Sequence, residues 1–237
     1  MRLSAPVFQL KRRARLLARA EKVALSEALD RVAREEGFAA WSLLASRLAR
    51  DLPGTTVLSR LADGDLLLLG ARPGHGKTLL GLQLLIDAAR QGRRAVFFTL
   101  EYSEGETQER IRFLAGGGKG PGNRLEIVDS DDVCADLIVR LLAGSPPGSI
   151  AVIDYLQILD QQRSKPALPE QLRVLQQFAR RSGAILAFIT QIDRSYDPKR
   201  RPLPDIRDVR LPNPVDLGLF SKACFLHDGA ARFQDMS

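Results

Sequence analysis

The chain has 237 residues, which is enough for one full domain and a small appendage. Its content of 45% hydrophobic and 27% charged residues is ordinary for a soluble globular protein. No apolar run approaches the length of a membrane span, and the basic N-terminus lacks the apolar core of a signal peptide. These features exclude the membrane-spanning and signal-peptide classes, and we expect a cytoplasmic protein without a membrane partner.

Cysteine and histidine do not predict a metal centre. Cys134 and Cys224 are far apart and lack metal-ligand spacing, so we expect them to be reduced packing residues of a cytosolic protein. His75 and His227 are not expected to form a cluster either.

The net charge of +7 is concentrated at the N-terminus. Residues 1–50 carry 11 Lys and Arg against 5 Asp and Glu, whereas the rest of the chain carries 24 against 23. Such asymmetry indicates either a polyanionic partner or a solvated basic arm.

The first 52 residues are predicted to form a basic segment of about three short helices. Apolar spacing predicts helices over residues 6–20, 26–36 and 39–50, with Ser26 as the N-cap of the second and Trp41 facing inward in the third. So small a core is marginal, and we expect these helices to pack on the main domain or on another chain. Their basic face is compatible with nucleic-acid binding, with docking of a protein partner, or with a solvated surface.

A linker is expected at residues 51–55, where Pro53 and Gly54 interrupt the helical pattern. A short lead-in helix is predicted over residues 58–62. The main domain is then expected to run over residues 58–237.

A phosphate-binding loop is predicted where residues 65–78, DLLLLGARPGHGKT, pass from an apolar strand-like run into a helical pattern. Gly74 and Gly76 allow backbone N–H groups to face a triphosphate, and the start of the helix adds its positive dipole end. Lys77 can reach the β- and γ-phosphates, and the Thr78 hydroxyl can ligate Mg²⁺. We therefore predict that the chain binds ATP and Mg²⁺. The predicted ATP-binding residues are Ala71, Arg72, Pro73, Gly74, His75, Gly76, Lys77, Thr78 and Leu79.

Three further buried strands are predicted to end at polar side chains. Residues 94–100, 150–154 and 184–190 are apolar runs that end at Glu101, Asp154 and Gln191. Ligands of open parallel sheets bind at the carboxyl ends of the strands. Glu101 could therefore orient or deprotonate the attacking water, Asp154 could hold the magnesium shell opposite Thr78, and Gln191 could sense the γ-phosphate. The residues alone leave open that Glu101 is a capping or surface residue and that Gln191 is an ordinary strand-end residue.

The remaining pattern completes an alternation of strands and helices. It predicts helices over residues 104–114, 133–142 and 168–181, a strand over residues 125–128, and loops over residues 116–122 and 157–168.

The motifs ARPGHGKT, TLEY, VIDYLQIL and TQIDRS, in this order and at these intervals, resemble the C-terminal ATPase domain of DnaB-type replicative helicases. That domain belongs to the RecA-like P-loop group, as do the KaiC and RadA relatives. The resemblance implies an α/β fold whose mostly parallel sheet carries helices on both faces. It also implies that Lys77 binds phosphate, Glu101 is the catalytic base, Asp154 is the magnesium-shell carboxylate, and Gln191 links the γ-phosphate to the nucleic-acid loops.

In that family the loops after the fourth and fifth strands touch the DNA backbone, which implies single-stranded DNA as a partner. Here these loops would be residues 161–169 and 193–214. The second has a net charge of only +2, and a solvated loop explains its composition equally well. The candidate nucleic-acid contacts are Arg163, Lys165, Arg194, Lys199, Arg200 and Arg201.

The resemblance also has gaps. In the family, strands that carry an arginine finger follow the strand matched here by residues 222–227, and we expect them to be absent, with Arg232 as a possible finger. The basic segment replaces the family's primase-interacting domain. An arginine supplied in trans is worth roughly 10³–10⁵ in rate where it operates, so we expect slow hydrolysis or plain ATP binding.

These observations favour a DnaB-like ATPase acting on or near DNA. RecA-like ATP sites usually lie between subunits, so a ring or filament of identical chains is expected. The alternative is a nucleotide-gated switch or adaptor, in which the nucleotide orders the loop at residues 193–214 and the basic helices dock a protein partner. A kinase-like phosphotransferase would suit the same fold, but no acceptor-binding motif supports it.

Overall fold

The computed structural model describes residues 3–5, 7–41, 43–44, 54–115, 121–160, 165–210, 215–227 and 230–236. The chain divides into two compact units, Met1–Leu52 and Pro53–Ser237, each with its own hydrophobic core. Within the described ranges, no helix combines the length and the apolar character that crossing a bilayer requires.

The N-terminal unit is built on two packed helices, α1 (Val7–Glu21) and α2 (Leu25–Glu35). The prediction that Ser26 caps the second helix is wrong, because Ala24 occupies the N-cap position without a side-chain hydrogen bond. The chain turns sharply after α1: Lys22 has a left-handed φ of 54°, and the Val23 N–H donates to the Ala18 carbonyl at 3.2 Å. This turn brings the chain into the helical conformation one residue before Ser26.

The core of the N-terminal unit also takes in the beginning of the third predicted helix. Residues 41, 43 and 44 are helical, and Trp41 and Leu44 pack inward as predicted, whereas residues 42 and 45–50 lie outside the described ranges. Glu36 is only 6% exposed and accepts hydrogen bonds from the backbone N–H of Ser4, at 2.7 Å, and from its hydroxyl. These hydrogen bonds lower the pKa of Glu36.

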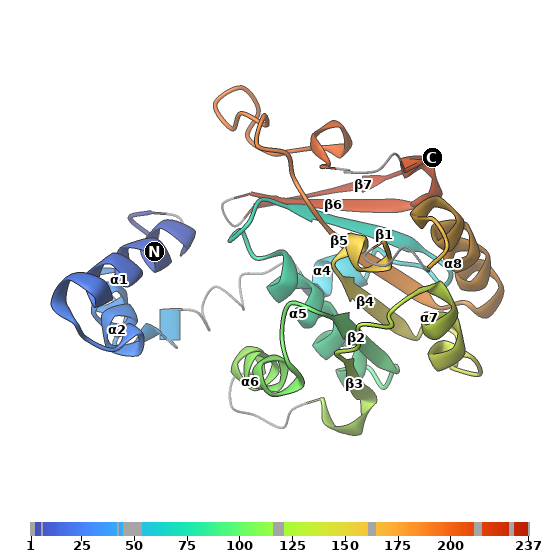
Figure 1. The fold of residues 1–237 in the computed structure, drawn as a ribbon, viewed down its shortest axis with the longest axis horizontal. Coiled ribbons are helices and arrows are strands. Elements are labelled where there is room, and N and C mark those ends of the chain that lie inside the picture. The colour runs from blue at the N-terminus through green and yellow to red at the C-terminus, as the bar shows by residue number, and fades with distance from the viewer. Residues whose placement is uncertain are drawn as a thin grey trace. The chain divides into compact units, whose positions relative to one another are not determined.

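The main unit contains, among its described residues, a seven-stranded sheet in the order β3-β2-β4-β5-β1-β6-β7 (Figure 1). Neighbouring strands are parallel except for β6 and β7. The apolar runs predicted as buried strands lie in the centre of this sheet, where both faces are covered. The strands are β1 (Leu66–Ala71), β2 (Ala95–Thr99), β3 (Leu125–Val128), β4 (Ile150–Asp154), β5 (Ile185–Gln191), β6 (Lys222–His227) and β7 (Ala230–Asp235).

Helices cover both faces of this sheet (Figure 1). α5 (Lys77–Arg90) packs on one face, where a Cβ added at Gly81 would meet Val152 and Ile189. α7 (Ala135–Leu142) and α8 (Leu168–Ser182) pack on the other face, against alternate strand residues such as Leu68 and Phe188. α6 (Glu104–Leu114) follows β2 and begins with a capping box formed by Ser103 and Glu106. The predicted α/β class, with a mostly parallel sheet between helices, is confirmed.

Three elements differ from the prediction. The lead-in helix is α4 (Gly54–Leu58), which begins in the expected linker and ends at residue 58, where the helix was expected to begin, because Val57 and Leu58 are buried and α4 packs on α5. The expectation of no further strand after residues 222–227 is wrong, because β7 pairs antiparallel with β6 and contains Arg232. In addition, the loop expected from residue 157 begins with a short 3₁₀ helix, Leu156–Asp160.

Candidate nucleotide-binding site

The predicted phosphate-binding loop joins β1 to α5 at the carboxyl edge of the sheet. Gly74 and Gly76 have φ angles of 83° and 90°, in the left-handed region that other residues rarely adopt. The His75 N–H donates to the Arg72 carbonyl at 3.2 Å, which closes a tight turn. Gly76 is the N-cap of α5, so the N–H groups of the first helical turn and the positive end of the helix dipole face the loop. This geometry suits a bound phosphate.

Four predicted site residues converge beside this loop. The Thr78 hydroxyl donates to Asp154 Oδ2 at 2.7 Å, which joins the start of α5 to the end of β4. The ammonium of Lys77 lies 4.0 Å from Glu101 Oε2 and 3.9 Å from Asp154 Oδ1. With both carboxylates ionised, the three charges sum to −1, so the site favours a further cation.

Asp154 has the properties of a magnesium-shell carboxylate. Its side chain is fully buried, and burial raises its pKa to about 6, although Lys77 and the hydrogen bond from Thr78 oppose the shift. Among the described residues, Oδ1 has no hydrogen-bond partner. An ordinary core carboxylate would have all its lone pairs satisfied, so this free oxygen beside the Thr78 hydroxyl fits Mg²⁺.

The metal would need substrate oxygens to complete its coordination. The described residues contain no group of three or more His, Cys, Asp and Glu side chains arranged around a common point. Mg²⁺ is usually held by one or two protein oxygens together with phosphates and water, and Thr78 with Asp154 provides such a partial set.

Glu101 follows β2 and Gln191 ends β5, the two strands on either side of β4. The Glu101 N–H donates to Thr99 Oγ1 at 3.1 Å, and 31% of the Glu101 side chain is exposed. Water can therefore reach its carboxylate. Gln191 is the last residue of β5, pairs in register with Ala71, and accepts a hydrogen bond at its carbonyl from the Arg210 N–H at 2.8 Å. Its position lies between the phosphate-binding loop and the residues that follow β5.

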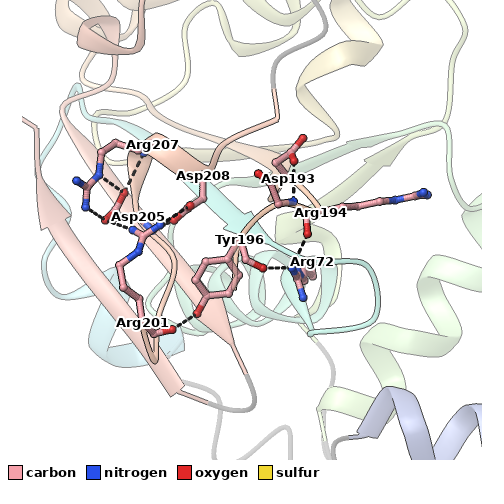
Figure 2. Close-up of polar contacts among 9 residues, drawn as sticks. Arg72, Asp193, Arg194, Tyr196, Arg201, Asp205, Arg207 and Asp208 are labelled. Carbon is pink, nitrogen blue, oxygen red and sulfur yellow. Dashed lines mark hydrogen bonds and ion pairs between the residues drawn. The ribbon is translucent and has the colours of Figure 1, made fainter. Parts of the chain in front are cut away.

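Two loop residues make side-chain contacts that the sequence did not predict. The guanidinium of Arg72 donates to the carbonyl oxygens of Arg194, at 3.0 Å, and Tyr196 (Figure 2). The imidazole of His75 stacks on that of His227, with ring centroids 4.8 Å apart, so the expectation that these histidines do not cluster is wrong. The partners lie far apart in the chain, and only the parallel pairing of β1 with β5 and β6 brings them together.

The candidate nucleic-acid residues fall into different environments. Lys165 donates to the carbonyls of Asp131 and Val133 at 2.6 and 3.1 Å, so its ammonium ties down the residues that precede α7. Arg201 forms ion pairs with Asp205 and Asp208 at 2.6 Å each. Arg194, Lys199 and Arg200 are exposed, and Arg163 lies outside the described residues.

No family model matches the chain, but curated relatives do. A probable plasmid replicative DNA helicase of Chlamydia muridarum is 25% identical over 180 residues, and one of Chlamydia trachomatis is 26% identical over 180 residues. Each alignment covers 63% of this chain and 40% of the relative, so the chain spans less than half of their length.

Solved structures support the same resemblance. One solved ATPase domain has a TM-score of 0.56 and 20% identity, covering 73% of this chain and 74% of that domain. A DnaB-like replicative helicase, described with its interactions with primase, has a TM-score of 0.56 and 19% identity, covering 71% of this chain and 49% of that one. The resemblance to the DnaB-type ATPase domain is thus confirmed as a distant sequence similarity and a shared RecA-like fold.

Proposed function

We propose that this chain, as a distant relative of DnaB-type replicative helicases, binds ATP with Mg²⁺ and hydrolyses ATP slowly when acting alone. The observation that carries the proposal is the position of the Lys77 ammonium, about 4 Å from both Glu101 and Asp154 at the start of α5. A phosphate-binding loop, a metal-type carboxylate and a solvent-accessible carboxylate meet at that point. These are the parts that phosphoryl transfer to water requires.

Each residue has a distinct role in this proposal. The N–H groups of residues 74–78 and the Lys77 ammonium bind the β- and γ-phosphates, and Thr78 and Asp154 hold the metal. When bound, Mg²⁺ neutralises charge on the phosphate oxygens. Glu101 accepts a proton from the attacking water or orients that water, and Gln191 hydrogen-bonds the γ-phosphate. An arginine from a second copy of the chain, in a ring or filament, would accelerate hydrolysis by roughly 10³–10⁵.

Single-stranded DNA is the proposed partner of the exposed cations after β5. Arg194, Lys199 and Arg200 are exposed on the segment that follows Gln191, and cations of this kind follow a phosphate backbone without reading bases. Arg201 is left out of this set because its charge is compensated by two carboxylates. The basic face of α1 is a second surface for a polyanion or a protein partner.

The decisive experiment compares ATP hydrolysis by wild type, Glu101→Gln and Glu109→Gln, each with and without single-stranded DNA. Glu109 is an exposed residue of α6 and provides the matched control. We expect Glu101→Gln to lower the turnover number by roughly 10²–10⁴ while ATP still binds, and Glu109→Gln to behave as wild type. Equal turnover in wild type and Glu101→Gln would exclude the assigned role of Glu101.

The second candidate is a nucleotide-gated switch or adaptor without useful turnover. The contact of Arg72 with the carbonyls of Arg194 and Tyr196 favours it, because the loop that binds phosphate also holds a surface segment. ATP binding with negligible turnover in all three proteins, and no effect of DNA, would support this candidate over the ATPase.

A further inference from the structure

Residues 193–210 form a closed loop that begins and ends at one place. Ile192 and Val209 form an antiparallel bridge, the Arg210 N–H donates to the Gln191 carbonyl at 2.8 Å, and the Asp193 N–H donates to the Asp208 carbonyl at 2.7 Å. We call these residues the β5 loop. Because its two ends are hydrogen-bonded to each other, the β5 loop leaves the sheet and returns to it as one unit.

The β5 loop has an internal structure of its own (Figure 2). Tyr196 is 2% exposed, and its hydroxyl donates to the Arg201 carbonyl at 2.8 Å. The Arg201 guanidinium pairs with Asp205 and Asp208, which are 5% and 8% exposed, and Arg207 pairs with Asp205 at 2.7 Å. These arginines hold the pKa of Asp205 well below its usual range. These ion pairs compensate the buried charges within the loop, and Tyr196 also packs into the hydrophobic core of the main unit.

The phosphate-binding loop holds the β5 loop at Tyr196. Arg72 donates to the carbonyls of Arg194 and Tyr196, and its guanidinium carbon lies 5.2 Å from the centre of the Tyr196 ring. The imidazole of His227 also contacts Tyr196. The two rings meet edge-on with their centroids 5.5 Å apart, and the His227 ring stacks on that of His75. Two residues of the phosphate-binding loop, Arg72 and His75, therefore connect to the same tyrosine.

We propose that Arg72 is a positioning residue that couples nucleotide binding to the order of the β5 loop. A bound phosphate fixes the backbone of residues 72–76, which fixes the origin of the Arg72 side chain. Arg72 then holds the carbonyls of residues 194 and 196 in place, and with them the exposed cations Lys199 and Arg200. The coupling rests on the proposed nucleotide binding and is separate from the γ-phosphate contact assigned to Gln191. By linkage, a polyanion that orders the β5 loop also raises nucleotide affinity.

Limited trypsin digestion measures this coupling directly. The peptide bonds after Lys199 and Arg200 lie in an exposed part of the β5 loop, and mass spectrometry identifies their cleavage. Each variant is digested with and without a non-hydrolysable ATP analogue and Mg²⁺, at a concentration that saturates that variant in its own binding titration. We expect the nucleotide to slow cleavage of wild type by about fivefold or more, and to leave Arg72→Met with nearly the same rate in both conditions.

Two further variants separate coupling from simple loosening of the loop. Tyr196→Phe removes the hydroxyl that binds the Arg201 carbonyl but keeps the backbone carbonyl that Arg72 contacts. It should raise cleavage with and without nucleotide by the same factor, so the nucleotide effect survives. Arg72→Lys keeps a charged nitrogen that can donate to both carbonyls, as Nη2 of Arg72 does, and should keep part of the effect, because it lacks the planar group that lies over the Tyr196 ring.

Three outcomes would overturn the proposal. If the analogue does not bind wild type in the titration, both the proposed function and the coupling fail. If it binds but leaves cleavage of wild type unchanged, the coupling alone fails. If Arg72→Met binds the analogue and shows the wild-type nucleotide effect, Arg72 is only an anchor and the coupling does not pass through it.

Discussion

At the scale of single residues, Asp154 combines a proposed metal-binding role with a cost in stability. Its carboxylate is fully buried, one oxygen has no hydrogen-bond partner among the described residues, and its pKa is raised to about 6. Burial therefore disfavours the ionised form, and the Lys77 ammonium, 3.9 Å from Oδ1, offsets only part of this cost. Residues kept at functional sites often carry such a cost.

We predict that Asp154→Asn stabilises the metal-free main unit at pH 8. The folded-state pKa lies above the unfolded value of 3.8, so this group contributes stability below pH 3.8 that is lost as the pH rises through about 6. A shift of this size corresponds to about 3 kcal/mol, which the neutral amide would not lose. Urea unfolding followed by circular dichroism in the presence of a chelator, at pH 8 and at pH 4, measures the difference.

Asp132→Asn provides the control for this experiment, because Asp132 is an exposed carboxylate. It should leave the unfolding free energy unchanged at both pH values. Asp154→Asn should also lose magnesium-dependent nucleotide binding. A variant less stable than wild type at pH 8 would show that the buried carboxylate is already fully compensated in the folded protein.

At the scale of elements, α5 depends on close contact with the sheet. A Cβ added at Gly81 would lie 2.9 Å from Val152 Cγ1 and 3.1 Å from Ile189 Cδ1, closer than packed atoms allow. Gly105 of α6 has nothing within 4 Å of the same atom. These two helical glycines thus differ in the space that surrounds them.

Alanine substitutions at these glycines should therefore have opposite effects. Gly81→Ala is expected to destabilise the main unit by about 1–3 kcal/mol, because overpacking at the sheet exceeds the gain in helix propensity. Gly105→Ala should stabilise by up to about 1 kcal/mol. Thermal or urea unfolding of both variants measures the change in the free energy of unfolding. Stabilisation by both substitutions would show that α5 can shift away from the sheet without a loss of stability.

Some helices and strands could be predicted from the sequence, and others could not. Strands β1, β2 and β4 were predictable because both of their faces are buried, which leaves uninterrupted apolar runs. α4 was misplaced because Thr55, Thr56 and Val57 are poor helix formers, and burial against α5 outweighs their local preference. β7 alternates weakly, and the Asp-Gly pair between residues 222–227 and 230–235 is the feature of the sequence that favours a hairpin there.

The candidate site was predictable only in part, for a related reason. Lys77, Thr78, Glu101 and Asp154 each lie at a strand or helix end, and parallel topology brings such ends to one edge. The contacts of Arg72 with the carbonyls of Arg194 and Tyr196 join backbone and side chain across 122 and 124 residues. No local pattern encodes such a contact, so only the structure could find it.

At the scale of the whole molecule, positive charge is displayed on two surfaces. The N-terminal segment carries most of the net charge of +7, and α1 exposes Arg12, Arg15 and Arg19. On the main unit, the exposed cations of the β5 loop form the second surface. Exposed cations contribute to polyanion binding in proportion to the phosphates they neutralise.

We predict that the double variant Lys199→Gln with Arg200→Gln weakens binding to single-stranded DNA and lowers its salt dependence. Neutralising two phosphate contacts should reduce the slope of log affinity against log salt by roughly 1.4. Lys165→Gln is the matched control, because the Lys165 ammonium is bound by two carbonyls and should add nothing to the slope. Fluorescence anisotropy across a salt series measures the affinity and its salt dependence for both variants. An equal loss of affinity in Lys165→Gln would indicate that DNA contacts the residues near α7 instead.

The place of β1 in the sheet has a consequence for how the chain folds. β1 precedes the other strands in sequence, yet its neighbours are β5 and β6, and the hydrogen bond from the Leu66 N–H to Ser221 Oγ closes a separation of 155 residues. Contacts between residues so far apart in the sequence form slowly, because a long stretch of chain must be ordered before the contact can stabilise the fold. During synthesis, strand β1 therefore completes its pairing only after almost the whole main unit has been made, so the proposed nucleotide site exists only in the finished fold.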